Sequence, residues 1–202
     1  MNKHTTTEWQ YYLVRLILNT ENSFGLITIA IHWIMALFII GLFIIGKYMV
    51  SLDYYDPFYH TGPWWHKSFG LVIGFMLVYR IIWKIQNPTV KPFDSYKKYE
   101  ISLAKLIQTL LYIILIVCCI SGVMISTAEG AGISFFDLFE IPALIAMGKS
   151  QAELAGETHY YATYTLIILA GLHMLAALKH HFLDKDITLL RILRTNFNEK
   201  KL

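Results

Sequence analysis

Hydrophobic positions in this chain fall in long runs free of charged residues, rather than in the short periodic stripes typical of soluble helices and strands. Three runs contain no Asp, Glu, Lys or Arg: Asn22–Gly46, Leu106–Ala128 and Thr158–Leu178. A fourth run, Trp64–Ile85, is apolar in its middle and has basic residues near both ends. Because about 20 apolar residues of helix cross the hydrocarbon core of a bilayer, the pattern predicts four membrane-spanning helices, at about 27–49, 64–85, 103–127 and 157–182.

These spans predict an all-α fold, an integral membrane four-helix bundle formed by residues 27–182. Residues 1–26 are an N-terminal extension in which the string WQYYLVRLIL is a candidate amphipathic helix, and residues 183–202 are a C-terminal tail. The first span is longer than the apolar part of a signal peptide, and no small-residue cleavage site follows it. We therefore interpret it as an uncleaved anchor.

Composition excludes several other classes of protein. Of the 202 residues, 56% are hydrophobic and 15% charged, whereas an ordinary soluble domain has roughly 25% charged residues. Intrinsic disorder needs low hydrophobicity, and a disulfide scaffold needs more than the two cysteines present. A nucleic-acid partner is not expected, because the net charge is only +3. The lipid bilayer is the first partner that the composition implies.

Basic residues are sorted to one side of the predicted spans. Fourteen of the 17 lysines and arginines lie in three segments: the residues before the first span, Arg80 to Lys105, and Lys179 onward. Cytoplasmic loops carry this excess, so we expect both termini in the cytoplasm and a multi-pass protein of the bacterial inner (plasma) membrane. The loops Ser51–Pro63 and Glu129–Gly156 then face the periplasm, and the aromatic part of the second loop is expected in the membrane interface.

Four of the eight histidines lie inside the spans, where ionisable groups are costly and usually mark a site. Depth divides them into two sets. His32 and His173, the inner pair, lie toward the cytoplasmic ends of their spans, and His66 and His159, the outer pair, lie toward the periplasmic ends. The 14 residues from His159 to His173 correspond to about 21 Å of helical rise and to about 40° less than four turns, so both rings project from one face.

Two imidazoles at one level, from different helices, are the two axial ligands that six-coordinate haem b needs. A single histidine of this kind could equally be hydrogen-bonded to a neighbouring helix, but four at matched depths favour ligands. A di-iron site would add glutamates inside the bundle, and the cores of the spans hold none. At least one of the two positions three and four residues beyond each histidine is small and leaves room for a macrocycle: Ala36, Gly70, Ala162 with Thr163, and Ala176 with Ala177.

Weaker predictions concern four residues of the second span. Gly70 and Gly74 form a small-xxx-small pair that would allow another helix to approach closely. Lys67 and Arg80 are candidates for pairing with haem propionates, although basic residues at span ends are common without that role.

Two further residue pairs have default interpretations. His180 and His181 follow the last span and are expected to be solvated, with a contact to a propionate or a quinone as the alternative. Cys118 and Cys119 lie within the third span, and apolar packing is their expected role, because the chain has no CxxCH motif for covalent haem attachment.

From Asn19 to about Leu193 the chain resembles the prokaryotic cytochrome b561 family. The resemblance is carried by seven strings: NTENSFGLITIAIHW, DYYDPFYH, HKSFG, ISGVMISTAEG, ISFFDLFEIPAL, AGETHYYATY and GLHMLAALKHHFLDKDITLLRIL. It implies a four-helix membrane cytochrome with two haem b groups. The matching histidines in such proteins are the axial ligands of the haem irons, in the pairs His32 with His173 and His66 with His159.

The resemblance also implies electron transfer across the inner membrane, between a quinone/quinol pool (ubiquinone or menaquinone) and another periplasmic or membrane redox partner. We expect no catalytic residue beyond the haem ligands; if the protein is an enzyme, it is a quinone-linked oxidoreductase. One alternative is a superoxide oxidase, a superoxide:quinone oxidoreductase, although the outer loops carry seven acids and only Lys149 as a clear cation. Another is the cytochrome b anchor subunit of a larger dehydrogenase complex.

Overall fold

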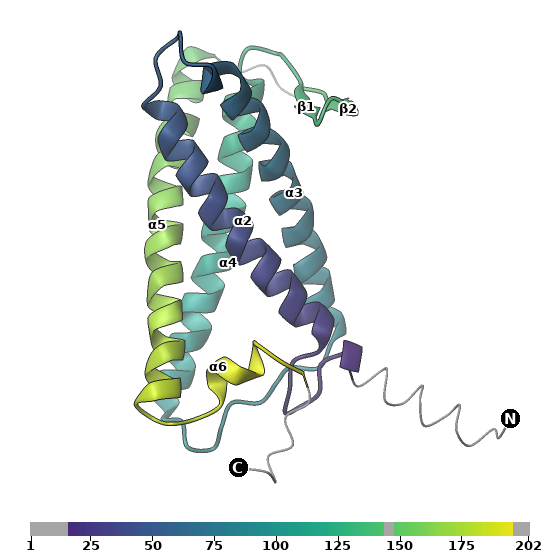
Figure 1. The fold of residues 1–202 in the computed structure, drawn as a ribbon, viewed down its shortest axis with the longest axis vertical. Coiled ribbons are helices and arrows are strands. Elements are labelled where there is room, and N and C mark those ends of the chain that lie inside the picture. The colour runs from purple at the N-terminus through teal and green to yellow at the C-terminus, as the bar shows by residue number, and fades with distance from the viewer. Residues whose placement is uncertain (1–15, 144–147, 196–202) are drawn as a thin grey trace, which may run out of the picture. The chain divides into compact units, whose positions relative to one another are not determined.

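The computed structural model describes residues 16–143 and 148–195, and these residues are mostly helical (Figure 1). Four long helices are present in this part of the chain: α2 (Leu26–Val50), α3 (Phe58–Gln86), α4 (Lys98–Thr127) and α5 (Lys149–Phe182). All four are long and apolar enough to cross a membrane, which confirms the predicted fold class. Most of the candidate amphipathic helix in the N-terminal extension lies outside the described residues.

The helix ends agree with the prediction to within one residue, but three of the starts do not. Helices α3, α4 and α5 begin at residues 58, 98 and 149 instead of 64, 103 and 157. Capping explains the difference for two of them, since the Lys97 N–H donates to Glu100 Oε2 (3.0 Å) and the Gly148 N–H donates to Gln151 Oε1 (2.7 Å). A side chain that reaches back in this way fixes where a helix begins, whereas hydropathy marks only its apolar part.

The chain forms two compact units, and each long helix contributes to both. The first unit contains the described parts of Met1–Ile34, Val78–Ala104 and Leu172–Leu202. The second unit contains the described parts of Met35–Leu77 and Lys105–Gly171. The inner histidine pair therefore belongs to the first unit and the outer pair to the second.

Within the first unit, polar side chains fasten the start of α2 to the end of α3. The Asn19 Oδ1 accepts hydrogen bonds from the Gly25 N–H (2.9 Å) and the Thr28 hydroxyl (2.7 Å). Thr28 Oγ1 in turn accepts from the indole N–H of Trp83 (3.0 Å). Gly25 is required here, because a Cβ on it would overlap the backbone carbonyl of Ile17.

The short helix α6 (Thr188–Arg191) is held in the same unit by a buried arginine. Arg191 donates from Nη1 to the Lys91 carbonyl (3.0 Å), and its guanidinium lies 3.6 Å from the centre of the Phe93 ring. The indole N–H of Trp33 on α2 donates to the Ile192 carbonyl (2.8 Å). These contacts fix the segment that follows α5 against α2 and the connection between α3 and α4.

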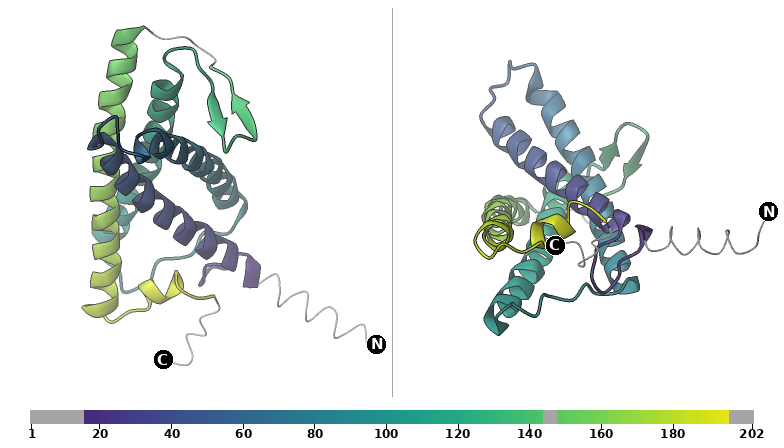
Figure 2. Two further views of the ribbon diagram at one scale, coloured as in Figure 1. Left: turned by 45° about the horizontal axis from the view of Figure 1, so that its top comes forward. Right: turned by 60° about the horizontal axis from the view of Figure 1, so that its bottom comes forward.

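In the second unit, part of the predicted outer loop forms a hairpin, which the all-α prediction did not include. Strands β1 (Ile133–Phe135) and β2 (Phe139–Ile141) are antiparallel, with Phe135 opposite Phe139 (Figure 2). Phe136 and Asp137 at the turn have φ of 51° and 58°. Turns of this kind favour Gly or Asn, and a larger residue in this region costs roughly 1–2 kcal/mol.

Contacts with α3 compensate for this strain. The Phe136 ring packs against Trp64 and Phe69, with centroids 5.7 and 5.2 Å away, and the Phe136 N–H donates to the buried Ser68 hydroxyl (3.3 Å). Asp137 accepts from the Ser134 hydroxyl (2.7 Å) and from the Trp64 indole (3.0 Å), and these bonds hold the pKa of Asp137 below its usual value. The hairpin is therefore a fixed part of the second unit.

Replacing Ser68 by alanine should loosen the hairpin, because the Phe136 N–H would lose its partner. A buried donor left without a partner costs about 1–3 kcal/mol. We expect faster limited proteolysis across residues 133–141 in detergent. Ser51→Ala is the control, since that exposed hydroxyl bonds only to the Tyr48 carbonyl of its own turn (2.7 Å); equal protection in the two variants would contradict the assignment.

Candidate functional site

The structure brings the four membrane histidines together as two pairs. His32 on α2 faces His173 on α5, with ring centroids 6.3 Å apart and ring planes at 73°. His66 on α3 faces His159 on α5, with centroids 6.2 Å apart and planes at 78°. All four side chains are half-buried. Each pair joins two different helices, and α5 contributes one ring to each.

The spacing of the rings is suited to one metal ion between them. A metal–imidazole bond of about 2 Å, plus about 1.1 Å from the nitrogen to the ring centre, places the centroids of two axial imidazoles about 6.2 Å apart. The observed separations of 6.3 and 6.2 Å match this value. Both pairs therefore have the centroid spacing that two imidazoles sharing one metal ion would need.

Hydrogen bonds fix the protonation of the His159 ring. Its Nδ1 lies 3.0 Å from the Cys118 carbonyl and 3.2 Å from the Ser121 hydroxyl. That hydroxyl has one hydrogen, which it donates to the Val117 carbonyl at 2.6 Å. Both neighbours of Nδ1 are thus acceptors, so Nδ1 carries the proton and Nε2 keeps the lone pair that a metal needs.

Two glycines give the outer rings their space. A Cβ on Gly46 would lie 3.2 Å from Cε1 of His66, and a Cβ on Gly122 would lie 3.2 Å from Cε1 of His159. By contrast, a Cβ on Gly70 or Gly74 would meet no protein atom within 4 Å. The predicted close helix approach at Gly70 and Gly74 is therefore wrong, whereas open space beside Gly70 suits the predicted room for a macrocycle.

A cation lies beside the inner pair. Nη2 of Arg80 on α3 is 3.3 Å from Nδ1 of His32. The Trp33 ring lies edge-on to the His32 ring, with centroids 5.3 Å apart. Arg80 thus contacts a histidine ring itself, a position that its prediction as a propionate partner did not specify. Lys67, the other candidate, is exposed.

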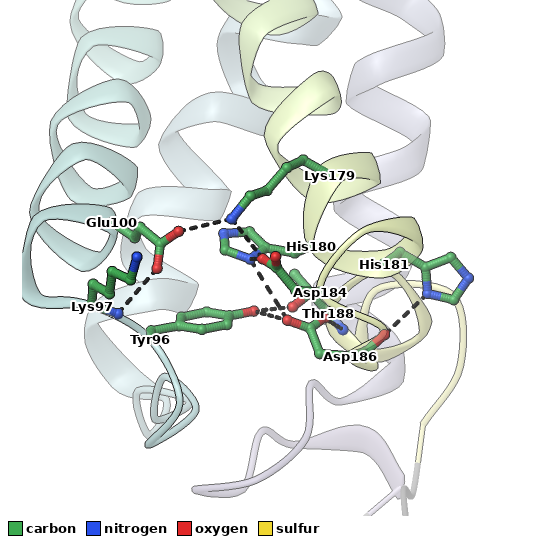
Figure 3. Close-up of polar contacts among 9 residues, drawn as sticks. All are labelled: Tyr96, Lys97, Glu100, Lys179, His180, His181, Asp184, Asp186 and Thr188. Carbon is green, nitrogen blue, oxygen red and sulfur yellow. Dashed lines mark hydrogen bonds and ion pairs between the residues drawn. The ribbon is translucent and has the colours of Figure 1, made fainter.

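The first unit also contains a network of polar side chains at the end of α5, the Lys179 cluster (Figure 3). The ammonium of Lys179 bonds to Glu100 (2.8 Å) and to Asp184 (2.6 Å), and His180 bonds to Asp184 (2.7 Å). The His180 ring stacks on Tyr96, with centroids 4.4 Å apart. The prediction of a solvated His180 is therefore wrong, because its partners come from the loop before α4 and from the turn after α5.

The ion pairs of the Lys179 cluster join the start of α4 to the end of α5, which is a structural role. The hydrogen bond from Lys179 lowers the pKa of Asp184, and burial raises the pKa of Tyr96 to about 12. Glu100, His180 and Asp184 are close enough to share a metal ion. However, the Lys179 ammonium already neutralises both carboxylates. The His181 Nδ1–H donates to the Asp186 carbonyl (3.1 Å), as Figure 3 shows.

Sequence comparisons identify the family. The model of prokaryotic cytochrome b561 matches residues 23–195. The chain belongs to this family. It is 41% identical over 175 residues to "Cytochrome b561 homolog 2" of Escherichia coli (strain K12), covering 87% of this chain and 93% of the relative. It is 27% identical over 176 residues to "Probable superoxide oxidase CybB" of Yersinia pestis, covering 86% and 97% of the two chains.

Members of this family are membrane proteins that transfer electrons, and the four apolar helices agree with a multi-pass membrane protein. Haem b is the cofactor expected for the family. The two histidine pairs fit that cofactor, since each offers two imidazoles at ligand spacing. Residues that the sequence prediction missed are Gly46, Gly122, Ser121 and the Cys118 carbonyl. The last three lie in or beside the string ISGVMISTAEG, but no residue type in it identifies a partner for histidine.

Replacing Gly122 by alanine should disturb the outer pair, because the new Cβ would press on the His159 ring and displace its bond to Cys118. Disturbing a group that orients a metal ligand typically costs about 10–100-fold in affinity. We expect purified protein with less haem per chain, measured by pyridine haemochrome assay. Gly41→Ala is the control, since a Cβ there meets no atom within 4 Å; unchanged haem content in Gly122→Ala would contradict the role of this glycine.

Proposed function

We propose that the protein carries two haem b groups, one held by each histidine pair, and moves electrons across the bacterial inner membrane to or from a quinone pool. The observation that carries the proposal is the pairing itself. Two imidazole pairs, from three helices, each have the centroid spacing that a shared metal ion requires. One pair would supply a single redox centre, whereas two supply a relay.

The ligand residues restrict the chemistry that each centre can perform. His32 with His173, and His66 with His159, would occupy both axial positions of an iron, so neither pair leaves an open position for oxygen. When bound, haem b supplies a one-electron carrier. The histidines hold it, and the surrounding apolar helix residues keep water away. This favours electron transfer over oxygen activation.

Charge distribution supports an orientation for the relay. The described part of the first unit holds nine lysines and arginines together with the inner pair, whereas the described part of the second unit holds four. Cytoplasmic segments carry such an excess. We therefore infer that the inner pair serves the cytoplasmic side and the outer pair the periplasmic side of the inner membrane, with both termini in the cytoplasm. A ubiquinone or menaquinone in the lipid is the mobile partner that such a cytochrome would use.

Oxidation of superoxide, with a quinone as electron acceptor, is a second candidate function. It is favoured by the similarity to a relative named as a probable superoxide oxidase. Superoxide is an anion, and an outer site for it would need nearby cations. In the second unit, Lys149 forms a 3.9 Å ion pair with Glu153, and Lys47 lies over the Tyr164 ring at 5.3 Å. Lys67, which follows His66 in α3, is exposed and is the cation that supports this alternative. The seven acids of the outer loops make quinone-linked electron transfer the better supported function.

Replacing His173 by alanine should remove one haem and keep the other, because the outer pair lies in a separate unit. We expect two haems per chain in the unchanged protein, with a low-spin b-type alpha band after reduction by dithionite, and one in His173→Ala. His60→Ala is the matched control, since His60 is an exposed histidine in the first turn of α3 and belongs to neither pair. A single haem in the unchanged protein, or loss of both in the variant, would overturn the assignment.

Rapid mixing distinguishes the two functions. Oxidised protein is mixed with a short-chain quinol in one experiment and with superoxide in the other, and the alpha band is followed in time. Reduction by the quinol, without comparable reduction by superoxide, is the expected result. Faster reduction by superoxide, followed by reoxidation with quinone, would favour the superoxide oxidase.

A further inference from the structure

The two histidine pairs differ in what lies beside Nδ1 of their rings. At the inner pair, Nη2 of the Arg80 guanidinium lies 3.3 Å from Nδ1 of His32. At the outer pair, Nδ1 of His159 lies beside the Cys118 carbonyl and the Ser121 hydroxyl. One pair thus has a cation next to it, and the other has hydrogen-bond acceptors.

A permanent cation favours reduction of a nearby redox centre. Arginine stays protonated in proteins, and a one-electron reduction removes one positive charge from the centre that Arg80 repels. The interaction is strong where the dielectric constant is low. Arg80 therefore raises the reduction potential of a centre held by the inner pair.

The guanidinium acts there as a charge rather than as a hydrogen-bond donor. Arginine has no acceptor, so a bond to Nδ1 would require that nitrogen to be unprotonated. A neutral imidazole would then carry its proton on Nε2 and could not bind a metal through that atom. With Nε2 of His32 on a metal, Nδ1 keeps its proton and Arg80 remains a neighbouring positive charge.

Hydrogen-bond acceptors have the opposite effect on the outer pair. Donation from Nδ1–H makes a metal-bound imidazole more basic, and a more basic ligand stabilises the oxidised metal. Ser121 cannot reverse the direction of its bond, because its hydrogen is engaged by the Val117 carbonyl. Ser121 and the Cys118 carbonyl therefore lower the reduction potential of a centre held by the outer pair.

We propose that Arg80 on one side, and Ser121 with the Cys118 carbonyl on the other, place the inner centre at a higher reduction potential than the outer centre. One electron shared between them then rests at the inner centre: the outer centre is oxidised by one electron, the inner centre is reduced by one, and no bond or proton changes. In the proposed orientation this biases electrons from the periplasmic toward the cytoplasmic side. The inference rests on the proposed di-haem function.

The test is an equilibrium redox titration of the purified holoprotein, followed in the alpha band and by electron paramagnetic resonance. Unchanged protein should give two one-electron waves. Arg80→Gln should move only the wave of higher potential, downward, by at least tenfold in its reduction equilibrium, which is about 59 mV. Ser121→Ala should move only the wave of lower potential, upward.

Two further variants separate charge from structure. Arg80→Lys keeps the positive charge and should retain most of the potential difference. Lys98→Gln removes an exposed cation of the same unit and should leave both waves in place. If Arg80→Gln fails to bind haem at the inner pair, Arg80→Lys and Ser121→Ala still test the proposal.

The outcomes distinguish the inference from the function on which it rests. Fewer than two haems per chain would overturn the proposed function. Two haems would leave that function intact and overturn the inference if Arg80→Gln moves a wave upward, as removal of a bond to an imidazolate would, or if it moves neither wave. Shifts of the lower wave by Arg80→Gln, or of the upper wave by Ser121→Ala, would also overturn it.

Discussion

The arrangement of this cytochrome depends on one constraint: two imidazoles from different helices must face each other at a fixed spacing, 6.3 Å between centroids in one pair and 6.2 Å in the other. Nδ1 of His159 finds acceptors on α4, and His32 lies beside the Arg80 guanidinium. Nδ1 of His66 is buried without a hydrogen-bond partner among the described residues, so the ring spacing is what the two pairs share. Gly46 and Gly122 follow from the same requirement, since rings that must meet a partner at fixed distance need space beside them.

Sequence reasoning works well for properties that a rigid helix transmits along its length. Position in a span gives depth, so the partners of His32 and His66 could be predicted without knowing any contact. The phase of the helix gives the common face of His159 and His173. Contacts around the ring were not predictable in this way. Whether Ser121 or Arg80 faces a histidine depends on the rotation of a neighbouring helix, and no spacing within one helix encodes that rotation.

Two other differences have separate physical causes. The hairpin lacks the Asn-Gly or Asp-Gly turn that would predict it from the sequence. Its turn forms nevertheless, because contacts from α3 hold Phe136 and Asp137 in their left-handed conformation. His180 looks solvated from its charged neighbours in sequence, but the chain reverses after α5 and brings Asp184 back to it. The environment of Phe136 and Asp137 depends on residues distant in sequence, and the environment of His180 depends on the turn after α5.

Helix α5 is the only one of the four long helices in the described chain that carries two of the paired histidines. One residue inserted between them would turn one ring by about 100° relative to the other and lengthen their separation by about 1.5 Å. The loops between helices can change length without that effect. The number of residues between His159 and His173 is therefore fixed by the two pairs, whereas the side chains between them can vary.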